Sequence, residues 1–139
     1  MTLKMDKVAL TDFLNTVFTE VADSFTVEDI APMQGRIRLN VGPQHLRPGG
    51  TVSGPSMFAL ADVAVYLCIL AMIGPKALSV TTNCSIDFMR KPQAGCDLIG
   101  EVRLLKLGKQ LAVGDVLIYS EGQDAPVARA SLTYSIPQT

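Results

Sequence analysis

The stretch GPSMFALADVAVYLCILAMIGP, residues 54–75, is apolar except for one charged residue, Asp62. Pro55 favours a helix start, since a proline in the first turn lacks only an N–H that would have no intrahelical acceptor. Gly74-Pro75 marks the end of the helical pattern. The eighteen residues 56–73, between Pro55 and Gly74, are a borderline length for crossing a bilayer, but an aspartate near the centre would cost about 3 kcal/mol there. A helix that is apolar on all sides is therefore expected to be enclosed in a protein core.

Strand patterns flank this helix on both sides. Before it, residues 24–30 alternate in part between apolar and polar, and residues 35–41 alternate throughout. Four strand-like runs follow it, bounded by turns that contain glycine or proline: residues 78–88, 97–107, 110–119 and 127–135. The last three runs are joined by short connections, which predicts an antiparallel meander.

The predicted fold class is α+β. A helix over about residues 6–20 precedes two strands, the long helix and four further strands. A curved antiparallel sheet of about five to six strands, wrapped around the long helix, is the natural way to enclose it. The chain has no repeat or linker, so residues 1–139 are expected to form a single domain with its core over about residues 24–136.

The composition argues against several classes of function. The net charge is −1 and no run of Lys or Arg is present, so neither nucleic-acid nor membrane binding is expected. Three cysteines without a CxxC pair and a single histidine predict no metal site, and reduced thiols indicate a cytoplasmic protein. The N-terminus lacks a clean secretory core. With 48% hydrophobic and only 18% charged residues, we expect a buried subunit interface.

Asp62 is the residue that an apolar helix does not explain. Its neighbours three and four positions away include no Lys or Arg. A buried carboxylate without a partner costs several kcal/mol or titrates at a raised pKa, and such residues are enriched at functional sites. Two interpretations stay open: Asp62 is catalytic, or it faces solvent or holds a loop amide in a structural role.

The start of the helix supplies a second candidate. Gly54 presents a backbone N–H at the positive end of the helix dipole, which suits a developing negative charge, unless Ser53 or Gly54 is merely the N-cap. Eight residues separate Gly54 from Asp62, which is about 12 Å along one helix. A base and an oxyanion donor must both lie about 3 Å from one carbonyl, so helices from two subunits are needed to supply both.

The segment GGTVSGPSMFALADVAVY, residues 49–66, resembles hotdog-fold acyl-CoA thioesterases of the PaaI-like group. The similarity extends over about residues 41–136 and includes FMRKPQAG from residue 88 and LLKLGKQLAVGDVLIYSEG from residue 104. The resemblance implies a long helix wrapped by an antiparallel sheet, in homodimers or dimers of dimers. It implies that Asp62 is the nucleophile or general base attacking an acyl-CoA thioester, and that the Gly54 amide of the opposite subunit polarises the carbonyl. It implies no cofactor, because coenzyme A is part of the substrate.

The sequence departs from the signature of the group, which has an asparagine, a His-Gly-Gly and the aspartate. Counting back from Asp62, Ser53 replaces the histidine and Pro55 the second glycine. Arg47 replaces the asparagine, and the sole histidine, His45, is out of register. Ser53 could bind substrate, order a water or cap the helix. Arg47 could bind an anionic substrate group, pair with Asp62, or be a solvated loop residue.

Other candidates lie outside the helix. Thr81 and Thr82 fall where members of the group carry a hydroxyl that helps position water or the aspartate, although both are also ordinary strand residues. Two basic pairs could bind the nucleotide phosphates of coenzyme A or be solvated turn residues: Arg90 with Lys91, and Lys106 with Lys109.

Two functions compete on this sequence. The first is a thioesterase that converts acyl-CoA and water to a carboxylic acid and CoA. The second is a non-catalytic acyl-CoA-binding or sensing module, because two signature side chains are replaced. A hotdog dehydratase is disfavoured, since that chemistry calls for a histidine paired with an acid and His45 has no obvious partner.

Overall fold

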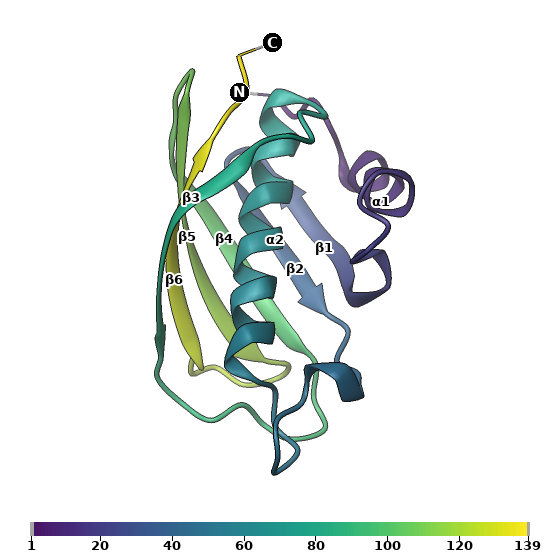
Figure 1. Cartoon of the computed structure of the whole chain (residues 1–139), viewed down its shortest axis with the longest axis vertical. Coiled ribbons are helices and arrows are strands. Elements are labelled where there is room, and N and C mark those ends of the chain that lie inside the picture. The colour runs from purple at the N-terminus through teal and green to yellow at the C-terminus, as the bar shows by residue number, and fades with distance from the viewer. Residues whose placement is uncertain (1, 139) are drawn as a thin grey trace.

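The computed structural model describes residues 2–138 and contains two α-helices, six strands and two 3-10 turns in that part of the chain (Figure 1). In chain order the elements are α1 (Lys7–Thr16), η1 (Ala22–Ser24), β1 (Phe25–Ala31), β2 (Gln34–Leu39), η2 (Pro43–His45), α2 (Gly54–Ile73), β3 (Val80–Phe88), β4 (Leu98–Leu107), β5 (Leu111–Ser120) and β6 (Ala128–Ser135). Every strand begins and ends within two residues of the predicted bounds. In β6, the alternation of apolar and polar residues that predicts the strand is also the alternation of buried and more exposed side chains.

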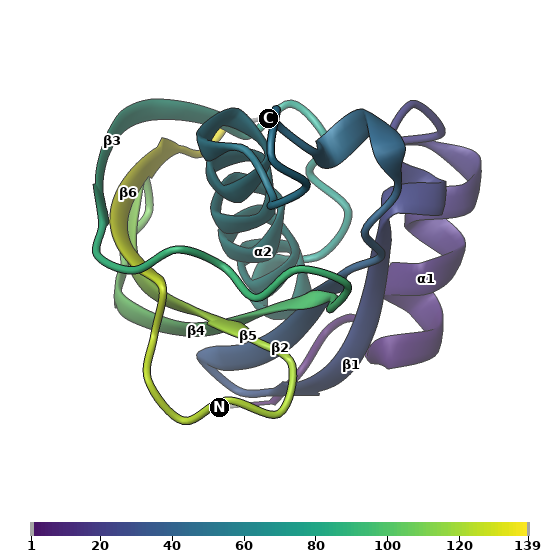
Figure 2. The same ribbon diagram turned by 90° about the horizontal axis from the view of Figure 1, so that it is seen from below.

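The six strands form one antiparallel sheet in the order β1-β2-β4-β5-β6-β3. The predicted meander is present as β4, β5 and β6, which pair as neighbours. Strand β3 pairs with β6 and therefore lies at an edge. The sheet curves around α2, as two perpendicular views show (Figures 1 and 2). This architecture confirms the predicted α+β fold of a long helix wrapped by a curved sheet.

Helix α2 fills the concave side of the sheet, and its residues 63–72 are all buried. Glycines on the facing strands let the helix approach closely. A Cβ at Gly114 would lie 3.2 Å from the side chain of Val65, and one at Gly100 would lie 3.4 Å from Leu60. Helix α2 is long and apolar enough to cross a membrane, but 72% of its apolar 18-residue window is buried inside the fold. It packs as a core helix.

Helix α1 ends at Thr16, four residues before the predicted end at about residue 20. The carbonyl of Phe13 accepts hydrogen bonds from the N–H groups of Val17 at 2.8 Å and Phe18 at 3.3 Å, which widens the last turn and stops the helix. Phe18 then packs edge-on against the ring of Tyr66 in α2, with ring centroids 5.7 Å apart. An apolar residue that continued the helical pattern in the sequence thus serves the core from outside the helix.

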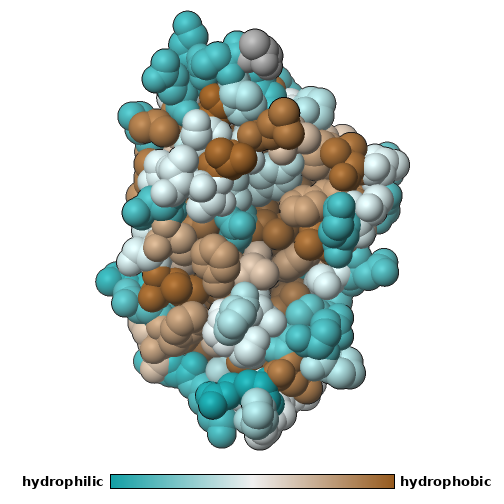
Figure 3. Space-filling view, in the orientation of Figure 1, coloured by the Kyte–Doolittle hydropathy of each residue, from teal (hydrophilic) through white to brown (hydrophobic). Residues whose placement is uncertain are grey.

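The two edges of the sheet are covered differently. Helix α1 packs against β1 at one edge, whereas β3 at the other edge has no fully buried residue. Large apolar side chains are exposed in and beside β3: Leu78 (80% exposed), Val80 (56%), Phe88 (52%) and Met89 (43%). Apolar side chains gather on the face where α2 and β3 lie (Figure 3). An exposed apolar edge of this kind is typical of interaction surfaces.

Candidate active site

Asp62 lies in the middle of α2 and is hydrogen-bonded to two strands. The hydroxyl of Thr81 on β3 donates to Oδ1 of Asp62 at 2.5 Å, and the hydroxyl of Tyr134 on β6 lies 2.6 Å from the same oxygen. The Tyr134 hydroxyl also lies 2.9 Å from the main-chain oxygen of Asp62. Both donors converge on Oδ1, and no donor among residues 2–138 bonds Oδ2. One oxygen of the carboxylate is therefore held and the other is free.

The Asp62 carboxylate has no charged partner among residues 2–138, since no Lys, Arg or His there forms an ion pair with it. Burial and the nearby Asp62 charge raise the pKa of the Tyr134 phenol well above its ordinary value, so the phenol stays protonated. The same two causes raise the pKa of the Cys84 thiol on β3. The half-buried Asp62 side chain thus lies among neutral hydrogen-bond donors.

Gly54 is the first residue of α2, and Ser53 is its N-cap. The Ser53 oxygen accepts from the N–H of Ser56 at 3.3 Å and its hydroxyl donates to the Ser56 hydroxyl at 3.0 Å. A Cβ at Gly54 would lie 3.3 Å from the ring of Phe88, so a glycine leaves room for that ring. The Gly54 N–H is one of the first N–H groups of the helix, which have no intrahelical acceptor, and it sits at the positive end of the dipole.

The structure does not bring Gly54 and Asp62 together within one chain. Both belong to the same continuous helix, so eight residues at about 1.5 Å each keep them roughly 12 Å apart. A single thioester carbonyl cannot contact both groups of one chain. A site completed by two subunits stays a prediction.

Of the two predicted threonines, only Thr81 reaches Asp62. The register between β3 and β6 shifts between Thr81 and Asn83, so Thr82 lies in an irregularity of the strand. The exposed Thr82 side chain donates to the carbonyl of Thr133 at 3.3 Å. The alternation of a regular strand could not reveal this shift.

The predicted basic residues are distributed over two ends of the molecule. Arg90 and Lys91 begin two residues after Phe88, the last residue of β3, at the end where α2 begins. The Arg90 guanidinium donates to the carbonyl of Pro126 at 2.8 Å. The β4–β5 hairpin, which carries Lys106 and Lys109, lies at the opposite end of α2 (Figure 1). Arg47 is exposed in the loop before α2 and makes no ion pair with Asp62 within residues 2–138.

Comparison with known proteins decides the family. The model of the thioesterase superfamily matches residues 49–127, more than half of the chain. This chain belongs to the thioesterase superfamily. The solved structure of a candidate thioesterase from Silicibacter sp. TM1040 is 58% identical, covers 99% of this chain and 95% of its own, and superposes with a TM-score of 0.92.

Two further structures are similar to this thioesterase. A mutant of the phenylacetic acid degradation protein PaaI from Thermus thermophilus is 29% identical over 86% of this chain and 98% of its own, with a TM-score of 0.72. A Streptococcus mutans protein bound to acetyl-CoA is 22% identical over 81% of this chain and 88% of its own, with a TM-score of 0.70, and shares the fold. The predicted resemblance is confirmed: this is a hotdog-fold, PaaI-like thioester hydrolase.

The loop that leads into α2 of this thioesterase is held by His45. Its Nδ1 accepts the N–H of Gly42 at 2.9 Å, so the proton is on Nε2, which lies 3.3 Å from the Ser24 hydroxyl. The carbonyl of His45 accepts the N–H of Ser53 at 2.8 Å. His45 is only 8% exposed, and burial lowers the pKa of its imidazole. The histidine that lacks a partner in the sequence is thus partnered and supports the residue next to Gly54.

Tyr134 is the polar neighbour of Asp62 that the sequence argument missed. It stands 72 residues from Asp62 along the chain, on the row of β6 that points toward the helix. The other members of that row are small or aliphatic: Ala128, Ala130 and Leu132. A buried tyrosine in such a row needs a hydrogen-bond partner for its hydroxyl. This requirement could have indicated from the sequence that Tyr134 meets a polar group in the core.

Proposed function

We propose that this thioesterase hydrolyses acyl-CoA, with Asp62 as nucleophile or general base and the Gly54 N–H of the opposite subunit as oxyanion donor. The single observation that carries the proposal is the Asp62 carboxylate, with Oδ1 held by two hydroxyls and Oδ2 free in an otherwise apolar helix. No metal and no redox cofactor enters the proposed reaction. Coenzyme A enters as part of the substrate.

Both forms of the chemistry balance with water alone. As general base, Asp62 takes a proton from water while the oxygen attacks the thioester carbon; the C–S bond then breaks and the thiolate is protonated. As nucleophile, Asp62 forms an acyl anhydride with release of the thiol, and water hydrolyses the anhydride. Either path develops a negative charge on the carbonyl oxygen, which a backbone N–H at a helix start stabilises. Thr81 supports the proposal by orienting the carboxylate.

The subunit arrangement in this proposal is a homodimer or a dimer of dimers with the site at the interface. The exposed apolar residues along β3, among them Val80 and Phe88, support pairing through that edge. Phe88 packs beside Gly54, so an interface along β3 lies next to the proposed oxyanion donor. Strand β3, whose Thr81 bonds Asp62 in the same chain, would then face the first turn of α2 in the other subunit.

Binding of coenzyme A has two supports. The Streptococcus mutans relative of the same fold binds acetyl-CoA. Arg90 and Lys91 follow Phe88 at the end where α2 begins, where a cation could meet phosphates. We assign Ser53 to helix capping and to contact with water, and Arg47 and Thr82 to the rim of the proposed site. Lys106 and Lys109 lie at the far end of the same chain and could act only on a partner's site.

The test of the activity is hydrolysis of short, medium, long and aryl acyl-CoA by wild type and Asp62→Ala, followed through released thiol. The expected result is a loss of kcat/KM of about 10³-fold or more in Asp62→Ala, with unchanged circular dichroism. Turnover retained by a purified, folded Asp62→Ala variant would overturn Asp62 as the reacting group. The length of the preferred acyl chain would also indicate the depth of the acyl-binding pocket.

The test of the shared site is subunit complementation. Gly54→Pro removes the N–H at a position where proline suits the first helical turn, but its Cβ also meets the Phe88 ring. Gly54→Ala meets the same ring and keeps the N–H, so it is the matched control. Mixed subunits of Asp62→Ala and Gly54→Pro would regain about a quarter of wild-type activity, because half of the dimers are mixed and one of their two sites is complete. No regain, in mixtures shown to exchange subunits, would mean that each site belongs to one chain.

The second candidate function remains a non-catalytic acyl-CoA-binding module, favoured by Ser53 and Arg47 in place of the signature side chains. It predicts that acyl-CoA binds without turnover and that Asp62→Ala leaves the affinity nearly unchanged. Calorimetry on the wild type, beside the hydrolysis assay, separates the two functions.

A further inference from the structure

The hydroxyl of Tyr134 is held beside Asp62 by packing as well as by hydrogen bonding. Tyr134 stands on the inner face of β6 and is 3% exposed. Its ring lies against Tyr66 of α2, with centroids 6.1 Å apart. Tyr66 in turn contacts the rings of Phe13 and Phe18, at centroid distances of 6.2 Å and 5.7 Å. Helix α1 and the turn after it therefore support the ring whose oxygen meets the carboxylate.

The hydrogen bonds make the two oxygens of Asp62 inequivalent. Oδ1 lies 2.6 Å from the Tyr134 hydroxyl and 2.5 Å from that of Thr81, and no donor in the described part of the chain bonds Oδ2. The terminal torsion of a free aspartate is broad, so without these donors the carboxylate would sample many orientations. Two donors on one oxygen select the orientation in which the other oxygen is available.

We propose that Tyr134 is a positioning residue of this thioesterase: its hydroxyl fixes the Asp62 carboxylate so that Oδ2 is the oxygen presented to the thioester or to the attacking water. The inference rests on the proposed function and adds a residue that acts through Asp62 without touching the substrate. Thr81, on the neighbouring strand β3, bonds the same oxygen and shares this positioning role.

A purely structural task for the hydroxyl makes a different prediction. A buried phenol needs a hydrogen-bond partner, and the carboxylate could serve only that need. Removing the hydroxyl would then change the free energy of unfolding and leave kcat unchanged. In a positioning task, the loss appears in kcat, because misorientation of the reacting oxygen affects the transition state more than substrate binding.

The chain offers a matched control. Tyr66 is the second buried tyrosine of the same aromatic cluster, and its hydroxyl donates to the carbonyl of Ala77 at 2.8 Å, away from the carboxylate. Tyr66→Phe and Tyr134→Phe therefore each remove one buried hydroxyl and keep the ring. We expect Tyr134→Phe to lower kcat by roughly 10- to 100-fold with KM within about twofold, the loss that follows from one hydrogen bond to a charged group. We expect Tyr66→Phe to change kcat by less than about threefold.

A second measurement does not depend on turnover. Denaturant unfolding of wild type, Tyr134→Phe, Asp62→Ala and the double variant is expected to give non-additive changes, because the two side chains share one hydrogen bond. Additive changes, or an unchanged kcat in folded Tyr134→Phe, would overturn the positioning task while the thioesterase proposal stands. An inactive wild type would overturn the proposed function and this task with it. A kcat loss equal in both tyrosine variants would also overturn it, since it would reflect general loosening of the cluster.

Discussion

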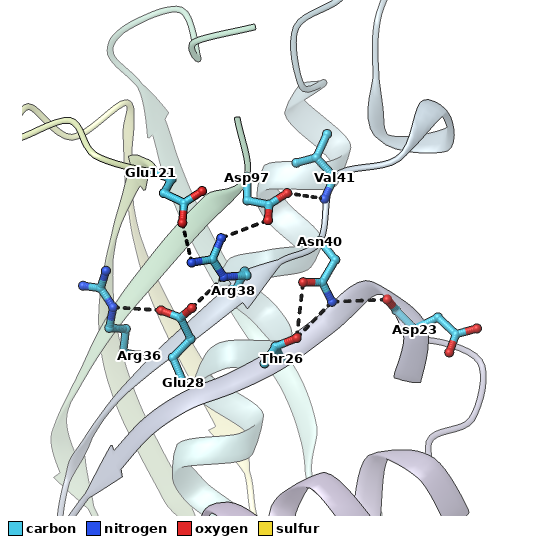
Figure 4. Close-up of polar contacts among 9 residues, drawn as sticks. All are labelled: Asp23, Thr26, Glu28, Arg36, Arg38, Asn40, Val41, Asp97 and Glu121. Atoms are coloured by element: carbon cyan, nitrogen blue, oxygen red, sulfur yellow. Dashed lines mark hydrogen bonds and ion pairs between the residues drawn. The ribbon is translucent and has the colours of Figure 1, made fainter. Parts of the chain in front are cut away.

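The molecule contains two polar clusters that satisfy carboxylates in opposite ways. On the outer face of the sheet, Arg38 bonds Glu28 at 2.6 Å, Asp97 at 2.9 Å and Glu121 at 2.6 Å (Figure 4). Arg36 adds bonds to Glu28 and Glu101. Each of these four carboxylates, of Glu28, Asp97, Glu101 and Glu121, meets a guanidinium. On the inner face, the Asp62 carboxylate meets two neutral hydroxyls and no cation among residues 2–138.

We expect the outer cluster to contribute mainly to stability and the inner cluster mainly to the proposed reaction. Burial alone would raise the pKa of Glu28, but its hydrogen bonds and charge contacts with Arg38 and Arg36 outweigh burial and the pKa is lowered. The same cluster holds the loop before α2, since the second oxygen of Asp97 accepts the N–H of Val41 at 2.9 Å. Matched charges of this kind fix strands to one another. Asp62 has no ion-pair partner among residues 2–138, and in the proposed function its second carboxylate oxygen is the one that reacts.

The largest effect is expected from neutralising the inner cluster. Asp62→Asn keeps an oxygen that can accept from Tyr134, so the free energy of unfolding should change by no more than about 1 kcal/mol. The loss of the reacting charge should lower kcat/KM by about 10³-fold. Denaturant unfolding and acyl-CoA hydrolysis, measured on the same preparation, check the free energy of unfolding and kcat/KM. A large loss of stability with little loss of activity would mean that the inner cluster serves stability and not the reaction.

The opposite pattern is expected from breaking the outer cluster. Arg38→Met leaves Glu28 and Asp97 without their shared cation, which should cost about 2–3 kcal/mol of unfolding free energy, because the Arg38 side chain is only 20% exposed. Activity at a temperature where the variant is folded should stay within about twofold.

Arg129→Met is the control for that variant. It removes an ion pair with Asp87 whose two side chains are 67% and 58% exposed, and it should cost less than about 0.5 kcal/mol. Equal melting temperatures for the Arg38 and Arg129 variants would contradict the structural importance of the outer cluster.

The sequence predicted the inner helix and the strands because both depend on local patterns. An apolar helix without a polar face must be enclosed, and the alternation around Arg36 and Arg38 is the pattern of a half-exposed strand. Asp62 stood out for the same reason, as a charge that the pattern does not explain. These predictions need only the period of each element and no knowledge of what packs against it.

The partners of those residues could not be predicted, because they depend on strand order. Arg38 meets Asp97 and Glu121 only because β4 inserts next to β2, while β3 crosses to the far edge. Tyr134 meets Asp62 for a similar reason, since β6 and α2 are brought together by the whole sheet. Alternation assigns a side chain to a face of the sheet, but it does not identify the residue that the side chain meets.

A smaller effect is expected from the pH dependence of His45, which holds the loop between the two clusters. Because burial lowers the pKa of His45, the folded protein favours the neutral imidazole and the unfolded chain takes up the proton at higher pH. The stabilising contribution is complete above the unfolded pKa of about 6.5 and is lost as pH falls through the folded pKa.

Unfolding free energies between pH 7.5 and pH 5 test this. His45→Gln retains a hydrogen-bonding side chain that does not titrate, and its profile should be flatter than that of the wild type. Parallel profiles would show that His45 does not carry the pH dependence.

The smallest effect is expected at Thr82, and its comparison with Thr81 measures how sharply the inner cluster is bounded. Thr82→Val removes a hydroxyl that bonds only the Thr133 carbonyl at 3.3 Å from an exposed position, so stability should change by less than about 0.5 kcal/mol and kcat by less than about twofold. Thr81→Val removes one of the two donors to Asp62 and should lower kcat by about tenfold. Both changes keep the β-branched shape that the strand favours, so backbone propensity is matched.

Steady-state kinetics on the two variants shows whether the effect on kcat is confined to the hydroxyl that bonds Asp62. If Thr82→Val lost as much activity as Thr81→Val, the hydroxyl bonded to Asp62 would have no special part, and strand β3 as a whole would be what the reaction requires.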